Sequence, residues 1–293
     1  MGNLGRVGYG GTLEGTWPYS YDSCDVGTLA NQTLNGEPAA NLHNGLDQSV
    51  DYALSYLSGQ RLSACTCPDD ETHPGPKMTD GSFRGRSAPE IDVIEAQVHD
   101  GVGEVSLSAQ WAPFDAYYEW NNVTYSKVED PAKAYLNTYK GGPFQQTSSY
   151  VGITNQECYQ YPLSGAAEGC FAVYAFEYKL GKDGYIKWFN DDELAWTYLE
   201  GGLGPNPASG VGNRPIPYEP MYIIFNLAIS LNFGAINFEG LEPMWPMKME
   251  VDYVRPSPCS RCHRLTGRQA DLPLLRHSPG PRLSGPERDP HRL

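Results

Sequence analysis

The chain has 293 residues, a formal net charge of −14, and abundant Gly (32), Pro (24) and Tyr (20). The strong acidity argues against a nucleic-acid partner and fits either a soluble surface or a neutral-sugar partner. The many turn formers and aromatic strand formers favour an all-β protein of one or two domains, with enough chain to bury a sizeable core.

Targeting signals are mixed. No segment approaches the roughly 18 apolar residues of a membrane helix, and the N-terminus has neither an apolar signal region nor a myristoylation pattern. Two glycosylation sequons, Asn31-Gln-Thr and Asn122-Val-Thr, indicate a secretory lumen instead. The cysteines allow two local disulfides, with free buried thiols as the alternative. The candidates are Cys24, Cys65 and Cys67 for one bridge and Cys158 with Cys170 for the other.

The first expected element is a short amphipathic helix over Asp47–Leu57. It is followed by the most informative stretch of the chain, Ala88–Val98, which holds Glu90, Asp92 and Glu95 among apolar neighbours. Closely held carboxylates are the groups with which proteins cleave or transfer glycosidic bonds.

Two backbones compete for the stretch that carries these acids. On a strand, Glu90 and Asp92 share a face, and one bulge before Glu95 returns that residue to the same face. On a helix the three side chains diverge, although Ser87 with Glu90 resembles a capping box. Periodicity alone leaves the two alternatives equal, and composition favours the strand.

Alternation and β-branching predict further strands, with a hairpin turn at Asp183-Gly184. They cover Glu104–Trp111, Phe171–Tyr178, Tyr185–Phe189, Met221–Ser230 and Met247–Val254. In the first of these, Val105, Leu107, Ala109 and Trp111 share one face, and Glu104, Ser106, Ser108 and Gln110 share the other. The whole pattern is typical of an antiparallel sandwich.

The last segment, Arg255–Leu293, differs from the rest. It holds eight Arg against three acids, a net charge of +5, so residues 1–254 carry −14 − 5 = −19. We expect a disordered tail. Cys259-Ser-Arg-Cys262-His263 matches a haem-attachment pattern, but no apolar frame surrounds it, so no metal or cofactor is expected.

Glu90-Ile-Asp-Val-Ile-Glu95 resembles the catalytic signature of glycoside hydrolase family 16 in its bulged form. More narrowly, several motifs resemble the fungal β-glucan synthesis-associated proteins, whose insertion before the catalytic strand would occupy residues 1–80. These motifs are Gly2–Tyr9, Trp17–Asp22, Cys24–Thr28, Leu62–Pro68 and His73–Pro76.

The resemblance covers residues 1–254 and implies a concanavalin A-like β-jelly-roll sandwich with a sugar cleft. It implies retaining chemistry on β-glucan, with Glu90 as nucleophile, Glu95 as general acid and base, and Asp92 as the residue that tunes the nucleophile. Candidate sugar contacts are Trp17, Gln110, Trp111 and Trp120, with core packing as the alternative for the aromatic residues.

The chain also departs from that family. We expect it to lack the N-terminal strands and the upstream membrane anchor, and its tail is unlike the family's closing sequence. The resemblance implies a protein of the secretory pathway or plasma membrane, on the lumenal or extracellular side.

Three hypotheses of function follow. The first is a hydrolase or transglycosylase of cell-wall β-glucan (β-1,6-glucan) biosynthesis and cell-wall organisation. The second is a non-catalytic β-glucan-binding scaffold, and the third is an inactive truncated fragment. The intact set of three acids favours the first hypothesis.

Overall fold

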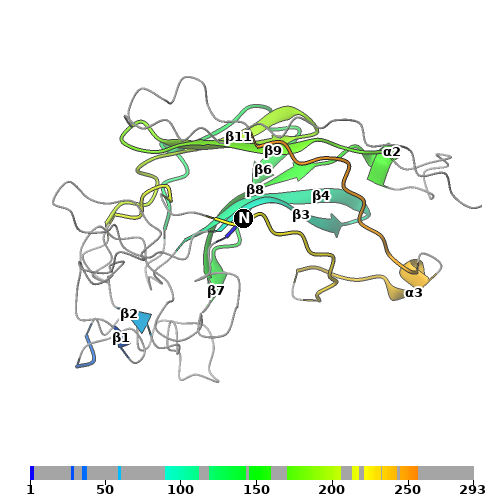
Figure 1. The fold of residues 1–293 in the computed structure, drawn as a ribbon, viewed down its shortest axis with the longest axis horizontal. Helices are drawn as coiled ribbons and strands as arrows, with labels where there is room; N and C mark the ends of the chain where they lie inside the picture. The colour runs from blue at the N-terminus through cyan, green and yellow to red at the C-terminus, as the bar shows by residue number, and fades with distance from the viewer. Residues whose placement is uncertain are drawn as a thin grey trace, which may run out of the picture. The chain divides into compact units, whose positions relative to one another are not determined.

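The fold was obtained as a computed structural model, in which the chain is mostly strand with very little helix (Figure 1). The structure describes residues 1–2, 28–29, 35–37, 59–60, 90–111, 119–142, 145–159, 170–205, 213–217, 221–231, 233–242 and 245–256.

Within these residues, two antiparallel sheets form the fold. The larger has the order β3 (Glu90–His99), β4 (Val102–Trp111), β8 (Gln145–Ile153) and β6 (Ala134–Leu136), with β7 (Gly141–Gly142) also paired to β8. The smaller has the order β5 (Ser126–Val128), β11 (Glu193–Leu199), β10 (Tyr185–Asn190) and β9 (Tyr174–Lys179). This architecture is consistent with the predicted all-β jelly-roll sandwich.

Three short elements complete the described structure. A two-stranded ladder joins β1 (Thr28–Leu29) to β2 (Gly59–Gln60). Helix α2 spans Gln156–Tyr159 and helix α3 spans Phe238–Leu241, where the Asn237 side chain accepts from the backbone N–H of Gly240. No described helix is long and apolar enough to cross a membrane.

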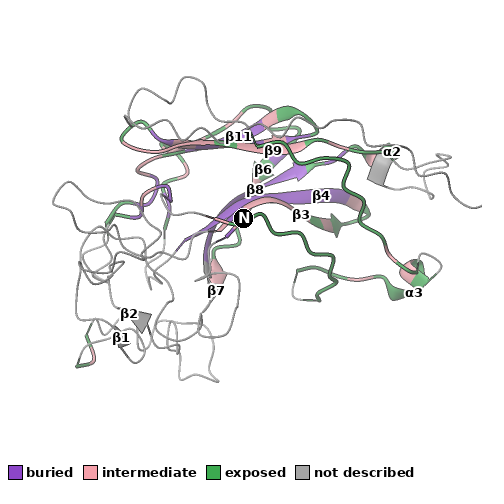
Figure 2. Cartoon of the chain, in the orientation of Figure 1, coloured by how far each residue is buried: buried purple, intermediate pink, exposed green. Residues whose placement is uncertain are grey.

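The core lies between the two sheets and is rich in aromatic rings. Strand β4 contributes the alternate residues Val105, Leu107, Ala109 and Trp111, as the sequence predicts (Figure 2). From the smaller sheet, Trp188 and Trp196 stack with ring centroids 4.2 Å apart and an interplanar angle of 1°. Both are fully buried, so this pair fills the space beneath β3 and β4.

The opposite face of the larger sheet is polar. Glu104 of β4 is 4 % exposed and accepts hydrogen bonds from Gln97 Nε2 of β3 at 3.2 Å and from the Tyr135 hydroxyl of β6 at 2.9 Å. Because a buried carboxylate is costly unless it is hydrogen bonded, these two donors stabilise Glu104 in its position. The carboxylate in turn fixes the orientation of the Tyr135 side chain.

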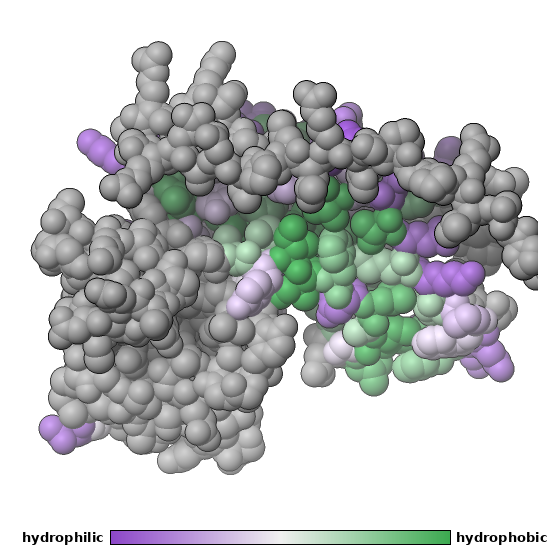
Figure 3. All heavy atoms as spheres, viewed as in Figure 1, coloured by the Kyte–Doolittle hydropathy of each residue, from purple (hydrophilic) through white to green (hydrophobic). Residues whose placement is uncertain are grey.

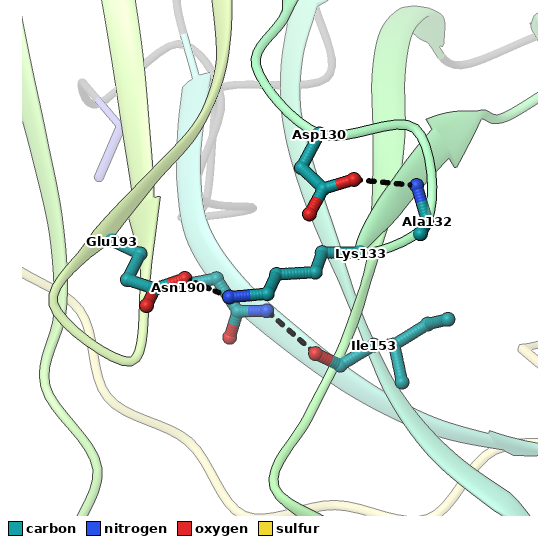
Figure 4. Close-up of polar contacts among 6 residues, drawn as sticks. All are labelled: Asp130, Ala132, Lys133, Ile153, Asn190 and Glu193. Atoms are coloured by element: carbon teal, nitrogen blue, oxygen red, sulfur yellow. Dashed lines mark hydrogen bonds and ion pairs between the residues drawn. The ribbon is translucent and has the colours of Figure 1, made fainter.

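One end of the sandwich is joined by polar contacts between the sheets. Asn190 of β10 donates its Nδ2 to the Ile153 carbonyl of β8 at 2.9 Å (Figure 4). Beside it, Lys133 pairs with Glu193, and Asp130 hydrogen bonds to the backbone of the turn that carries Lys133. The ion pair is exposed, so the buried amide contributes more to this junction than the pair does.

Several sequence predictions are confirmed. The stretch that carries the acids is strand β3, the alternating strand is β4, and Tyr185–Phe189 lies within β10. Strands β9 and β10 form the expected hairpin, although β9 begins at Tyr174 and not at Phe171. The predicted helix over Asp47–Leu57 lies outside the described residues.

Two predicted strands are wrong. Met221–Ser230 forms no strand: its Tyr222 makes an isolated bridge to Gly2, and large side chains such as Phe225 (54 % exposed) reach solvent. Met247–Val254 likewise forms no strand, and Val251 is half exposed. Figure 3 shows hydrophobic side chains gathered at the surface where the first segment runs. Local hydrophobicity favours burial, but burial depends on which segment lies alongside, and the large side chains of these two described segments remain about half exposed.

The outer edge of β3 is paired at its start. The backbone N–H of Ile91 donates to the Met1 carbonyl at 2.8 Å, and the Met1 amino group donates to the Ile91 carbonyl. Gly2 then bridges both Glu90 and Tyr222.

The chain divides into two compact units, Met1–Asp252 and Tyr253–Leu293. Of the second unit, only residues 253–256 are described, where the Arg255 guanidinium lies 4.2 Å from the Tyr253 ring centroid. The predicted disorder of Arg255–Leu293 therefore stays a prediction.

We expect Trp196→Phe to lower the free energy of unfolding by roughly 2–4 kcal/mol, because it removes a buried indole donor and part of the stacked core. Urea unfolding followed by far-ultraviolet circular dichroism measures the loss. Trp245→Phe, at a side chain that is 57 % exposed, is the matched control and should change stability little. Equal effects of the two variants would contradict this account of the core.

A second prediction concerns pH. Partial burial, together with the hydrogen bond to and the charge of Glu104, raises the pKa of Tyr135 from 10.0 to about 12. Because the folded state holds this proton more tightly than the unfolded chain does, its stabilising effect is complete below pH 10 and is lost as the pH rises toward about 12.

Tyr135→Phe should therefore flatten the dependence of stability on pH over that interval. The tyrosinate absorbance of the wild type minus that of the variant gives the titration of Tyr135 alone. This difference curve should rise at a higher pH than the absorbance of the other exposed tyrosines. A difference curve with an ordinary tyrosine pKa would rule out the contact between Tyr135 and Glu104.

Candidate functional site

The three acids meet on one face through a β-bulge. Asp92 pairs with Ser108 and Glu95 pairs with Ser106, so two residues of β3 stand opposite Leu107 alone. In a regular ladder Ile94 would be the partner of Ser106. The bulge places Glu95 there instead, on the polar face with Glu90 and Asp92, as the sequence hypothesis requires.

Asp92 is held by two side chains of β4. Its Oδ2 accepts from Ser108 Oγ at 2.9 Å and from Gln110 Nε2 at 3.0 Å. The side-chain oxygen of Gln110 in turn accepts from the Thr147 hydroxyl of β8. Hydrogen bonds therefore run across three strands, with Thr147 donating to Gln110 and Gln110 donating to Asp92. Because the Gln110 oxygen must accept and its nitrogen must donate, these two bonds fix the orientation of the Gln110 amide.

Ser108 links Asp92 to Glu95. Its Oγ lies 3.4 Å from Glu95 Oε2 as well as within reach of Asp92. A hydroxyl has one proton, so it donates to one carboxylate at a time, and the shorter distance favours Asp92. The two carboxylate oxygens are therefore no farther apart than these two distances combined, close enough for each charge to influence the other.

The bulge is supported from the core side by the stacked tryptophans. Trp188 Nε1 donates to the Asp92 carbonyl at 3.0 Å, and Trp196 Nε1 donates to the Leu107 carbonyl at 3.1 Å. A bulge disrupts the ladder, so backbone carbonyls beside it need other donors. Two indoles from the opposite sheet supply them, one on each strand of the bulged pair.

All three acids are half-buried, and the side chains beside them are nearly covered. Ser108 is fully buried, Gln110 is 6 % exposed and Thr147 is 3 % exposed. Hydrogen bonds in such surroundings are less weakened by water than surface ones. The arrangement suits chemistry that needs carboxylates held in fixed positions.

The predicted sugar contacts divide. Gln110 lies at the site, opposite Glu90. Trp111 and Trp120 do not. They are 4 % and 7 % exposed and belong to the core, where Trp111 donates to Ser148 and packs on Tyr198. The proposed stacking role is therefore wrong for these two rings, because a sugar cannot reach them. Trp17 lies outside the described residues.

The predicted modification sites are only partly visible. Asn122 is half-buried in a turn whose next residue, Val123, is 89 % exposed. Cys170 is disulfide bonded. The side chain of Cys158 and the positions of Asn31, Cys24, Cys65 and Cys67 lie outside the described part of the chain, so the pairing stays a prediction.

Sequence reasoning missed two supporting residues. Ser108 was assigned to the polar face, and its offset of two from Gln110 could have suggested that both reach the same acid. Trp188 is 96 positions from Asp92 in the chain, and no local signal connects them.

Comparison with known proteins gives a consistent picture. Residues 1–266 match the family described as beta-glucan synthesis-associated protein SKN1/KRE6/Sbg1. The chain is 41% identical over 257 residues to the beta-glucan synthesis-associated protein SKN1 of Candida albicans, covering 87% of this chain and 30% of that protein. It is 40% identical over 276 residues to KRE6 of Saccharomyces cerevisiae (strain ATCC 204508 / S288c), covering 93% of this chain and 34% of that protein.

The chain thus spans about a third of the length of the curated relatives it matches. No solved structure matches it. Because the family match extends over most of the sequence, including the strand that carries the three acids, the chain belongs to the family of β-glucan synthesis-associated proteins described as SKN1/KRE6/Sbg1.

Proposed function

We propose that this chain carries the catalytic face of a retaining β-glucan hydrolase or transglycosylase that acts in cell-wall glucan synthesis. The observation that carries the proposal is the bulge between Asp92 and Glu95, which gathers three carboxylates on one polar face of the sheet. A retaining glycosidase needs two such groups on opposite sides of the scissile bond.

Each acid has a distinct role. The Glu90 carboxylate attacks the anomeric carbon, while the Glu95 carboxylic acid gives its proton to the leaving oxygen. A covalent glycosyl ester on Glu90 results. Glu95, now a carboxylate, takes a proton from water or from a sugar hydroxyl, whose oxygen then displaces Glu90 from the sugar. Water gives hydrolysis and a sugar hydroxyl gives transglycosylation.

The contacts of Asp92 support a helper role for it. An acid that accepts from Ser108 and Gln110 on one oxygen is held in one position, and a fixed charge beside the reacting centre costs no reorganisation during the reaction. Its negative charge also favours retention of the proton on a neighbouring acid, which is what the general acid requires.

The substrate and the compartment are proposed from the relatives and from two chain features. The relatives are named for β-glucan synthesis. The disulfide of Cys170 and the accessible turn at Asn122 suit the lumenal or extracellular side of the secretory pathway. A neutral glucan also suits the acidic chain better than a polyanion would.

We expect Glu90→Gln to lower turnover of β-glucan oligosaccharides at least about a thousandfold, because the amide cannot form the glycosyl ester. Products should be followed chromatographically on β-1,6- and β-1,3-linked substrates. A fluorinated glycosyl donor that traps the intermediate should label wild-type protein on the peptide that contains Glu90, as seen by mass spectrometry.

Asp183→Asn, at an exposed turn between β9 and β10, is the control and should keep full activity. Turnover that survives Glu90→Gln, or a label on another residue, would overturn the assignment. Unlabelled protein that binds glucan without turnover would support a scaffold instead.

We expect Trp188→Phe to reduce kcat roughly tenfold to a hundredfold with little change in KM. The substitution removes the hydrogen bond to the Asp92 carbonyl, so the bulge that orients Asp92 and Glu95 loosens while the sugar-facing surface is kept. The pH profile of kcat should also change, because the distance between the two carboxylates is no longer fixed.

The matched control is Trp111→Phe, which also loses a buried indole donor, in this case to the Ser148 hydroxyl at 3.0 Å. The two variants should lose comparable stability in urea unfolding. Only Trp188→Phe should alter the pH profile. Identical kinetic behaviour of both variants would mean that Trp188 serves packing alone.

A further inference from the structure

Tyr135 and Glu95 stand in one row across the larger sheet. Glu95 pairs with Ser106, Ser106 pairs with Val151, and Val151 pairs with Tyr135. Directly paired residues of neighbouring strands point to the same face, so all four side chains lie on the polar face. Three strand spacings separate the ends of the row, which is about 14 Å.

The Tyr135 ring extends across β8. Strand β8 separates β6 from β4, so the Tyr135 hydroxyl must pass over it to reach Glu104 at 2.9 Å. Val151, the direct partner of Tyr135 on β8, is only 3 % exposed, as expected beneath such a ring. Tyr135 itself is 40 % exposed, so part of its side chain is open to solvent.

The ring is held rigidly for an exposed aromatic side chain. Its hydroxyl is bound by a carboxylate that is itself 4 % exposed and fixed by Gln97. A ring already fixed in position loses little conformational freedom when a ligand stacks on it. The rest of the row, Ser106 and Val151, is only 4 % and 3 % exposed, so a ligand laid along the row would contact its two ends, Glu95 and Tyr135.

We propose that the Tyr135 ring is a glucan-binding platform, a subsite a few sugar units away from the three acids, and that the bound polysaccharide crosses the strands along this row. The inference rests on the proposed function, because the direction of the polysaccharide along the row is taken from the role proposed for Glu95. The apolar face of a β-linked glucopyranose stacks on the ring, while its hydroxyls stay in water or bond to polar groups beside the row. One such group is the Asn137 amide, which donates to Ser149 at 3.3 Å.

The test measures binding by calorimetry in a Glu90→Gln background, where turnover is blocked, with a β-linked glucose disaccharide and hexasaccharide. Tyr135→Ala should weaken hexasaccharide binding roughly tenfold and leave disaccharide binding at the acids unchanged. Tyr135→Phe keeps the ring and should retain most of the affinity. Tyr135→Leu, which keeps apolar bulk over β8 without a flat ring, should behave like Tyr135→Ala and covers the case in which the alanine variant does not fold.

Tyr185→Ala is the matched control, because its hydroxyl also donates to a carboxylate, Glu177, but on the outer face of the smaller sheet. It should bind both ligands as the parent does. Equal hexasaccharide affinity of the parent and Tyr135→Leu, or a parent that does not bind the hexasaccharide, would overturn the subsite. Loss of binding in Tyr135→Leu together with undiminished turnover in Glu90→Gln would keep the subsite and refute the catalytic proposal.

Discussion

The site depends on two hydrogen bonds that cross the core, from Trp188 to the Asp92 carbonyl and from Trp196 to the Leu107 carbonyl. Each satisfies a carbonyl beside the bulge, where the regular ladder is interrupted, and leaving either unpaired in a dry interior would cost about 1–3 kcal/mol. Because the two rings stack on each other, movement of one donor disturbs the other. The smaller sheet thus supports the bulge of the larger sheet through the core, behind the face that carries the three acids.

On the polar face of the larger sheet, side-chain hydrogen bonds hold the carboxylates in place. Asp92 accepts hydrogen bonds from Ser108 and Gln110, and Glu104 accepts them from Gln97 and Tyr135, so each carboxylate has two donors from other strands of the sheet. Satisfied networks of this kind rigidify a sheet surface, whereas unpaired charges there would oppose folding. The contacts of Asp92 help to keep the acids in register, and those of Glu104 orient an aromatic ring. Hydrogen bonds thus hold the larger sheet on both of its faces. On the core face they go to backbone carbonyls, and on the polar face they go to Asp92 and Glu104, none of which is assigned a bond-making step.

The sequence predicted what depends on local pattern. Alternation in β4 placed Val105, Leu107, Ala109 and Trp111 on one face correctly, and the spacing of the acids required a bulge that is present. The same alternation already put Trp111 with the core residues, which contradicts the platform role assigned to it. The exposure of Met221–Ser230 and the contact of Trp188 with Asp92 could not be predicted, because each depends on which distant segment lies alongside. A hydrophobic pattern indicates that a segment would be stabilised by burial. Whether another segment packs against it depends on the tertiary structure.

The bulge also sets which residue of β3 faces the proposed polysaccharide. Without it, Ile94 would pair with Ser106 and head the row that ends at Tyr135, and Glu95 would point into the core. One extra residue therefore exchanges an apolar side chain for an acid at the head of that row, and it does so without moving Tyr135, which is positioned from β6 and Glu104. The alignment of an aromatic ring with the proposed acid and base is then a consequence of the same backbone irregularity that gathers the three carboxylates. Any change that removes the bulge would separate the chemistry from the row of side chains that we propose binds the glucan.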